Sequence, residues 1–372
     1  MAKSIRKIYL DYASSALSKS ANSGAVHELG VKEKNKLEQA RADIAKLLNS
    51  HKNEVVFTSG ATESNNLAIL GIKSGEVVTT NIEHASVLET CKHRQATFVP
   101  VESDGVVDPE KIKKVLNKNT VLVSVMYANN EIGTIQPIRE IAKEIRHFNK
   151  LNNTKIFFHI DATQAVNYLP VNVEKLGVDL MSFNAAKIYG PKGVGALYVR
   201  RGTPVSKIMF GGDQENGLRP GTENVAGAVA LALALENVEK IKEKESIRLT
   251  KLRDYFFLKL EKMSKDIFNS ELLVNGDRKN RLPNNVNITI PNIPSDLLVI
   301  ELSARGIMAS AKSACKSGDG KASHVIQAIN PNTKDTDGYL RFSLGRETSK
   351  KDIDHTIVAL VQILKKLKKW YD

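Results

Sequence analysis

The 372-residue sequence contains only two cysteines, Cys91 and Cys315, with no Cys-X-X-Cys or Cys/His spacing around them. This scarcity excludes a disulfide framework and gives no indication of a zinc or other metal site. No apolar run approaches the roughly 18 residues that a membrane-spanning helix needs. The first residues lack the apolar core of a signal peptide and the Arg/Ser-rich stretch of a transit peptide, so we expect a cytoplasmic protein without membrane contact.

Acidic residues are the minority of the charged ones, with 41 Asp and Glu against 54 Lys and Arg and a net charge of +13. Such an excess can indicate nucleic acid or an acidic protein as a partner. The lysines, however, are spread over solvated helix faces, and no aromatic residues alternate with them as a base-stacking surface would require. We therefore expect no direct binding to nucleic acid, and the charge alone assigns no function.

Short β-branched runs alternate with amphipathic stretches after residue 54, which predicts an α/β fold with a parallel sheet covered by helices. The seven candidate strands are 54–58, 76–80, 97–101, 120–126, 155–160, 179–184 and 193–199. A helical pattern then runs from 222 to about 265, and strand-like pieces mix with helices beyond it. The length permits two cores, so we expect a large domain of residues 14–240 and a smaller α+β domain of residues 1–13 and 241–372.

Ligands of open α/β sheets lie beyond the carboxyl ends of the strands. The segment Thr58-Ser-Gly-Ala61-Thr62-Glu-Ser-Asn lies at such a strand end and before a helix. Small residues there would let backbone N–H groups approach a phosphate at the helix N-terminus. Taken alone, the segment is more often an ordinary Ser/Gly turn with a threonine N-cap than a phosphate site.

Two charged residues end later strands. Asp161 closes an apolar run, where its carboxylate could keep a pyridinium nitrogen protonated or could simply cap the next helix. Lys187 follows the next strand, in Asn184-Ala-Ala-Lys187-Ile-Tyr-Gly. It could be a solvated lysine in a loop, or the amine that binds an aldehyde cofactor covalently.

The two cysteines have different surroundings. Cys91 follows Val87 and Leu88 on a helical stretch and is expected to be buried and inert. Cys315 lies in a small, polar segment, and the flanking Lys312 and Lys316 would favour its thiolate form. We therefore expect Cys315 to be the reactive cysteine.

The chain resembles the cysteine desulfurases of the class-V aminotransferase group over nearly its whole length. The motifs that carry the resemblance are Tyr9-Leu-Asp-Tyr, Phe57-Thr-Ser-Gly-Ala-Thr-Glu-Ser-Asn-Asn, Glu83-His84, Asn129-Asn-Glu-Ile-Gly, Asp161-Ala-Thr-Gln, Lys187-Ile-Tyr-Gly-Pro-Lys-Gly, Arg219-Pro-Gly-Thr222, Ser313-Ala-Cys and Arg341-Phe-Ser-Leu-Gly-Arg. The resemblance implies a fold type I enzyme dependent on pyridoxal 5'-phosphate (PLP), with a seven-stranded, mostly parallel sheet in its large domain and a smaller α+β domain. The Ser-Ala-Cys context is similar to the branch that serves iron–sulfur cluster assembly and tRNA thiolation.

The resemblance also implies roles for single residues. Lys187 would bind PLP covalently, His84 would stack on its ring, and Asp161 would pair with its ring nitrogen. Asn130 and Gln164 would contact the substrate or the ring hydroxyl, and Arg341 would bind the substrate carboxylate with both arms of its guanidinium. The cofactor phosphate would be held by the backbone around Ala61 and Thr62 and, from the second subunit of a homodimer, by Thr222. We also expect Asn184 to be a cofactor-binding residue.

The implied reaction converts L-cysteine to L-alanine. The Cys315 thiolate would take the substrate sulfur as a persulfide and pass it to a sulfur-acceptor protein. Two alternatives stay open: a PLP enzyme acting on another amino acid, such as a selenocysteine lyase or an epimerase, or a catalytically weakened scaffold of a sulfur-transfer complex.

The sequence departs from the family pattern at two places. Family members usually have Ser-Gly-His before the lysine, where this chain has Asn184-Ala185-Ala186. A lost hydrogen bond to a charged group costs about 1.5–3 kcal/mol, so we expect weaker cofactor binding unless another group substitutes. The segment between Asp11 and Asn22 is also shorter than in the family, with Ser23 in place of the usual proline.

Overall fold

The computed structural model describes residues 10–11, 13–15, 20–311, 323–334 and 336–371. Seven strands form one sheet: β1 (Val55–Thr58), β2 (Glu76–Thr80), β3 (Ala96–Val99), β4 (Thr120–Met126), β5 (Phe157–Asp161), β6 (Leu180–Asn184) and β7 (Gly195–Val199). Each of the seven predicted strands is present, with ends that differ by two residues at most. The sheet prediction is therefore confirmed.

The strand order is β1-β7-β6-β5-β4-β2-β3. Strands β2 to β6 pair in parallel, and only β7 runs against its two neighbours, β1 and β6. Consecutive residues of a strand enter different apolar clusters, as Val55 and Val56 of β1 do on opposite faces of the sheet. Because both faces are covered, the strands other than the edge strand β3 consist almost entirely of buried residues, as is typical of parallel sheets.

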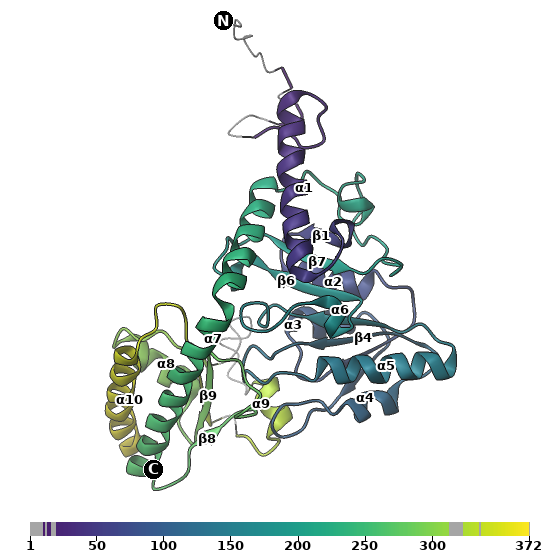
Figure 1. The fold of residues 1–372 in the computed structure, drawn as a ribbon. Coiled ribbons are helices and arrows are strands. Elements are labelled where there is room, and N and C mark those ends of the chain that lie inside the picture. The colour runs from purple at the N-terminus through teal and green to yellow at the C-terminus, as the bar shows by residue number, and fades with distance from the viewer. Residues whose placement is uncertain (1–9, 12, 16–19, 312–322, 335, 372) are drawn as a thin grey trace, which may run out of the picture.

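Helices cover both faces of this sheet (Figure 1). They are α1 (Glu28–Leu48), α2 (Ala61–Leu70), α3 (Ala85–Cys91), α4 (Pro109–Val115), α5 (Ile138–Asn152) and α6 (Val173–Leu176), with short 3-10 turns η1 (Lys52–Glu54), η2 (Ala185–Lys187) and η3 (Glu215–Gly217). Asp108 caps α4 by accepting from the Glu110 N–H, and Pro109 is its first residue. This is the helix start that Asp-Pro-Glu favours.

A 44-residue helix, α7 (Val225–Phe268), packs beside α1 and then runs to a second, smaller sheet. This sheet is antiparallel in the order β10-β9-β8, with strands β8 (Leu273–Val274), β9 (Asn285–Ile290) and β10 (Gly338–Ser343). Three helices accompany it: α8 (Ser295–Ser303), α9 (His324–Ile329) and α10 (Lys350–Tyr371). Figure 1 shows α8 and α10 at the lower left, on the far side of α7 from the large sheet.

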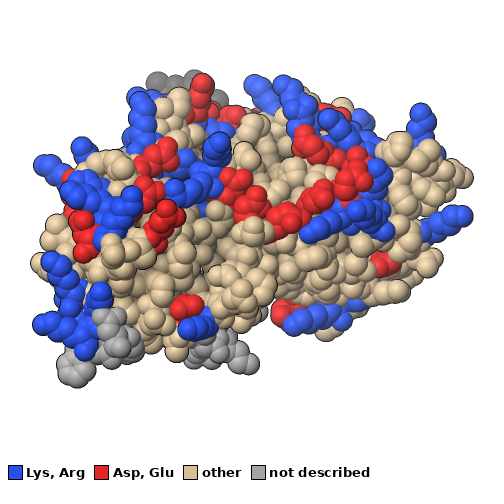
Figure 2. Space-filling model, turned by 90° about the horizontal axis from the view of Figure 1, so that it is seen from below, with Lys and Arg blue, Asp and Glu red and all other residues tan. Residues whose placement is uncertain are grey.

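The surface shown in Figure 2 mixes charges of both signs, with acidic side chains lying among the Lys and Arg side chains. This face therefore has no continuous basic surface, despite the overall charge of +13. None of the helices in the described ranges is long and apolar enough to span a membrane.

Candidate active site

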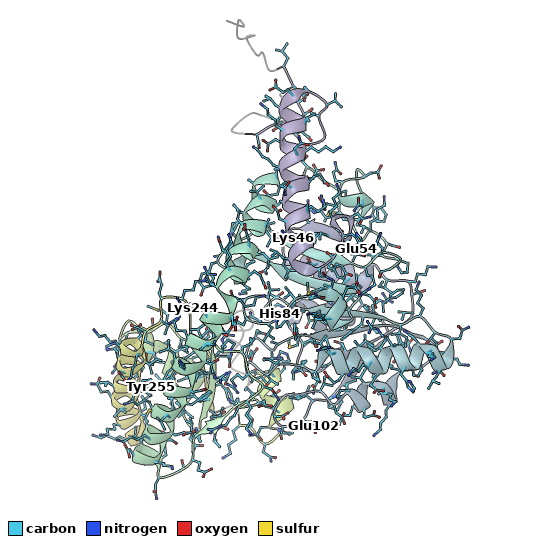
Figure 3. All side chains as sticks on the ribbon, viewed as in Figure 1. Lys46, Glu54, His84, Glu102, Lys244 and Tyr255 are labelled. Carbon is cyan, nitrogen blue, oxygen red and sulfur yellow. The ribbon has the colours of Figure 1, made fainter. Side chains whose placement is uncertain are left out.

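A cavity of about 540 Å³ lies where the carboxyl ends of the large sheet meet the small sheet. Figure 3 shows His84, one of its lining residues, between the two parts of the molecule. The described lining contains nine of the residues predicted for the site: Ala61, Thr62, His84, Asn130, Asp161, Gln164, Asn184, Lys187 and Arg341. Segments separated by as many as 280 residues of sequence, from Ala61 to Arg341, thus meet in one space.

The first wall of the cavity is the N-terminus of α2. Its N-cap is Gly60, which has no side chain, so a threonine does not cap this helix. Gly60 has φ 156° and ψ 178°, a conformation that essentially only glycine adopts. The N–H groups of Ala61 and Thr62 therefore have no side-chain cap and can bind an anion at the positive end of the helix.

A hydrogen-bond network fixes Asp161 at the end of β5. Its Oδ2 accepts from Asn65 Nδ2 at 2.8 Å, and its Oδ1 accepts from the Thr163 N–H at 2.9 Å. Asn65 Nδ2 also donates to Ser86 Oγ at 2.8 Å. Asp161 consequently has a local capping contact, as the alternative interpretation expected, and still faces the cavity.

The same network orients His84, the N-cap of α3. Its Nδ1 accepts from the Ser86 N–H at 3.1 Å and lies 2.8 Å from Ser86 Oγ. An accepting Nδ1 leaves the proton of the neutral ring on Nε2. The imidazole is thus held as one tautomer by its own helix start.

Lys187 ends the short turn η2 and is exposed to the cavity. The Asn184 Oδ1 accepts from the Lys187 N–H at 3.2 Å, so this asparagine shapes the lysine turn. The ammonium of Lys187 makes no ion pair or hydrogen bond with any residue in the described part of the chain. Ala185 is fully buried, whereas Ala186 lines the cavity.

The second wall comes from the small sheet. Arg341 on β10 donates from Nη1 to the carbonyl oxygen of Asn130 at 3.2 Å, and its backbone pairs with that of Ser310. Burial lowers the pKa of this guanidinium from its ordinary value, and the nearby Glu131 carboxylate opposes that effect. Its buried Nε has no partner within the described part of the chain. Arg341 is therefore a largely buried cation that can still donate hydrogen bonds to a ligand.

The loop from Asn129 to Gly133 joins the two walls. Asn285 and Asn287 of β9 both donate from Nδ2 to the carbonyl oxygen of Glu131, each at 2.9 Å. Gly133 permits this approach, because a Cβ at that position would lie 2.6 Å from Asn285 Cγ. The small sheet thus holds the loop that presents Asn130 to the cavity.

Glu83, next to His84, is fully buried below the site. Its Oε1 accepts from Thr80 Oγ1 at 2.7 Å and from the Met126 N–H at 2.9 Å. Burial raises the pKa of this carboxyl to about 8. Glu83 is therefore a neutral acid between about pH 4.5 and pH 8, where a surface glutamate is charged.

Two predicted residues are not among the described lining. Thr222 belongs to the segment after η3 and does not line the cavity of its own chain. Cys315 lies outside the described residues, so the structure gives no position for it. Cys91 is fully buried, and burial raises the pKa of its thiol to about 12, which agrees with an inert cysteine.

Sequence reasoning missed Asn65, Ser86 and Tyr189. Asn65 supports Asp161 across 96 residues of sequence, and Ser86 supports His84 from two residues further along the chain. Tyr189 lines the cavity two residues after Lys187; it belongs to the motif that begins at Lys187, but the motif alone assigned it no role.

A sheet whose carboxyl edge gathers a helix N-terminus, an aspartate and a lysine, opposite a confined arginine, defines an enzyme class that binds a phosphorylated cofactor and a small carboxylate. The family model for class-V aminotransferases matches residues 2–356. The chain therefore belongs to the class-V aminotransferase family.

Relatives within this family are similar over nearly the whole chain. The cysteine desulfurase IscS of Dictyoglomus turgidum is 41% identical, covering 98% of this chain and 96% of the relative. The cysteine desulfurase IscS of Methanosarcina thermophila is 40% identical, covering 93% and 86%. A solved structure titled NifS-like protein, 33% identical, superimposes with a TM-score of 0.84 and covers 93% of this chain and 92% of its own.

The family depends on PLP, and the donor set of the cavity fits this cofactor. An uncapped helix N-terminus suits the phosphate, a buried carboxylate suits the ring nitrogen, and a lysine whose ammonium has no partner among the described residues suits the aldehyde.

Proposed function

We propose that this protein is a PLP-dependent cysteine desulfurase that converts L-cysteine to L-alanine and transfers the sulfur onward. The observation that carries the proposal is the meeting of Lys187, Asp161, His84 and Arg341 around one cavity. The names and full-length similarity of the relatives support the choice of cysteine as substrate.

Within this proposal, the large-sheet wall holds the cofactor. Ala61 and Thr62 bind its phosphate through their N–H groups, Asn184 adds a side chain beside it, and Lys187 anchors it. Asp161, supported by two N–H donors, keeps the ring nitrogen protonated. Bound in this way, PLP withdraws electrons from the bonds at the substrate α carbon.

The small-sheet wall holds the amino acid. Arg341 receives the substrate carboxylate through two parallel hydrogen bonds, which lysine cannot reproduce. Asn130 and Gln164 line the space between the carboxylate and the ring. His84 presents an N–H at Nε2, because Ser86 occupies Nδ1. When the amine of Lys187 is not bound to the cofactor, it is the group that can move a proton at the substrate α carbon.

Sulfur transfer is assigned to Cys315. Its thiolate attacks the substrate sulfur, and a new S–S bond forms while the Cβ–S bond of the substrate breaks. The bonding electrons stay with Cβ, which takes up a proton, so that alanine leaves and Cys315 holds a persulfide. An acceptor protein then removes the sulfur, for iron–sulfur cluster assembly or tRNA thiolation.

We further propose a cytoplasmic homodimer in which Thr222 completes the phosphate site of the partner. The absence of Thr222 from the described lining of its own cavity supports this arrangement. We also propose the division into residues 14–240 and residues 1–13 with 241–372. It would place cofactor and carboxylate binding in different domains.

The alternatives find less support. None of the relatives named above is a selenocysteine lyase or an epimerase. A scaffold that had lost catalysis would not need Asp161, His84 and Lys187 around one cavity.

The test is an assay of alanine and sulfide from L-cysteine with a thiol reductant, using wild type, Lys187→Ala and Cys315→Ser. Wild type should release equal amounts of both products, Lys187→Ala neither, and Cys315→Ser should keep the visible band of bound PLP without sulfide release. A wild type that binds PLP and releases no alanine from cysteine would refute the proposal.

A further inference from the structure

Tyr189 has a backbone conformation that is unusual for its size. Its φ is +64°, and five of the seven described non-glycine residues with positive φ are asparagines. Asparagine tolerates this region, whereas a bulky side chain there is an outlier. Such strain persists only where surrounding contacts enforce it, and it is concentrated at functional sites.

The contacts that hold Tyr189 in this conformation come from Arg346. The centre of its guanidinium lies 3.9 Å from the centroid of the Tyr189 ring, and its backbone N–H donates to the Tyr189 hydroxyl at 3.1 Å. Gly345 passes close to the same hydroxyl, since a Cβ at that position would lie 3.3 Å from it. One aromatic side chain therefore meets both a cation and a backbone donor from the other wall.

Arg346 is itself fixed from α7. Arg248 donates to the carbonyl oxygens of Gly345, Arg346 and Thr348 at 2.9, 3.2 and 2.8 Å. Glu245 holds the same guanidinium, with its Oε1 at 2.7 Å from Nη2. Contacts from α7 thus hold the loop after β10 in place, and Tyr189 packs against this loop.

The position of this contact gives it a consequence for the site. Tyr189 is two residues after Lys187, and Arg346 is five residues after Arg341. Both Tyr189 and Gly345 line the cavity. The Tyr189–Arg346 contact is therefore a direct bridge between the turn that carries the lysine and the strand that carries the arginine.

We propose that Tyr189 is a positioning residue that sets the separation between Lys187 and Arg341, and so adapts the cavity to an α-amino acid. The inference rests on the proposed function, in which these two residues bind the cofactor and the substrate carboxylate. The amino group and the carboxylate of an α-amino acid are attached to the same carbon, so the amino acid fits only if the cofactor site at Lys187 and the guanidinium of Arg341 are a fixed distance apart. The cofactor itself needs only the large-sheet wall. Loosening the contact should weaken amino-acid binding and leave cofactor binding unchanged.

The test uses Tyr189→Gly, which removes the ring and relaxes the positive φ, so folding is preserved. Tyr189→Phe retains the ring and removes only the hydroxyl acceptor. Tyr255→Phe is the matched control: Tyr255 also contacts cations, Lys259 and Lys350, and hydrogen-bonds Asp354, but it lies on α7 in the small-sheet part (Figure 3).

The dissociation constant of L-alanine is measured from its effect on the visible spectrum of the PLP-loaded protein, and that of PLP from titration of the apoprotein. Tyr189→Gly should raise the L-alanine constant and the KM for L-cysteine about tenfold, with a smaller change in kcat, as expected for loss of a partly desolvated cation–π contact. Tyr189→Phe should raise both about twofold to threefold, and Tyr255→Phe should change neither. The PLP constant should stay at the wild-type value in all three variants.

Unchanged L-alanine binding in Tyr189→Gly would overturn the inference, and so would a parallel loss of PLP binding, which would show a merely structural contact. The outcome is separable from that of the proposed function. Failure of wild type to desulfurate cysteine refutes the function, whereas a wild-type response of Tyr189→Gly in an active desulfurase refutes only the positioning role.

Discussion

The two walls of the cavity are built in different ways. The large-sheet wall consists of side chains at successive strand ends, and buried polar contacts such as Asn65–Asp161 fix them. The small-sheet wall is one strand, β10, whose arginine is held by a backbone carbonyl of the opposite wall. The side chains of the first wall are fixed by contacts within the large-sheet part of the chain, while the second wall depends on contacts across the cavity. Cofactor binding should therefore be less sensitive to small displacements than substrate binding.

The largest expected effect concerns Glu83, which lies behind the large-sheet wall and should make the free energy of unfolding depend on pH. The pKa of Glu83 is raised from 4.5 to about 8 in the folded protein. The unfolded chain ionises this group first, so the stabilisation is complete below about pH 4.5 and is lost as the pH rises toward 8. The apoprotein should lose several kcal/mol of unfolding free energy over this window relative to Glu83→Gln. Urea denaturation at several pH values measures it, and parallel curves for the two proteins would contradict the assignment.

The buried ion pair between Arg41 and Glu215 should have the next largest effect on stability. Glu215 accepts from Arg41 Nη1 at 2.6 Å and Nη2 at 2.8 Å, and from the Phe57 N–H at 2.8 Å. Glu215→Gln removes the buried one of the two carboxylates that pair with Arg41, which should cost about 3–5 kcal/mol of stability.

The matched control for this pair is Glu38→Gln. Glu38 contacts the same arginine at 3.1 Å from a half-buried position at the surface, so its loss should cost less than about 1 kcal/mol. Equal losses in the two variants, measured by denaturant unfolding, would show that burial does not govern this part of the wall.

Asp161→Asn tests the catalytic contribution of the large-sheet wall. The amide can still accept from the Thr163 N–H, so the protein should fold and bind PLP, but the negative charge beside the ring nitrogen is lost. The kcat for cysteine should fall by about 10²–10³-fold, the range typical of removing one preorganised electrostatic contact. Retention of wild-type kcat would show that this carboxylate only caps the turn after β5.

Arg341→Lys tests the small-sheet wall. Lysine keeps the charge but cannot form two parallel hydrogen bonds, so the KM for cysteine should rise by about 10–100-fold. The affinity for PLP, determined by titration of the apoprotein, should stay unchanged. A joint loss of PLP and cysteine binding would remove the distinction between the two walls.

The large-sheet wall could be predicted from sequence because its residues directly follow β-branched runs. Asp161 and Lys187 were found in this way, and every predicted strand is present. The contacts of Asn65 with Asp161 and of Tyr189 with Arg346 could not be predicted from pattern alone. They depend on how α2 lies over β5 and on how the small sheet docks, over sequence separations of 96 and 157 residues.

The most direct measurement of the central claim is mass spectrometry of peptides from the PLP-loaded protein after brief exposure to L-cysteine. The account predicts one additional sulfur atom on the peptide that contains Cys315 and none on the peptide with the buried Cys91. It also predicts that Lys187→Ala acquires no sulfur at either position. Alanine formation without any sulfur on Cys315, or sulfur on Cys91 instead, would contradict it.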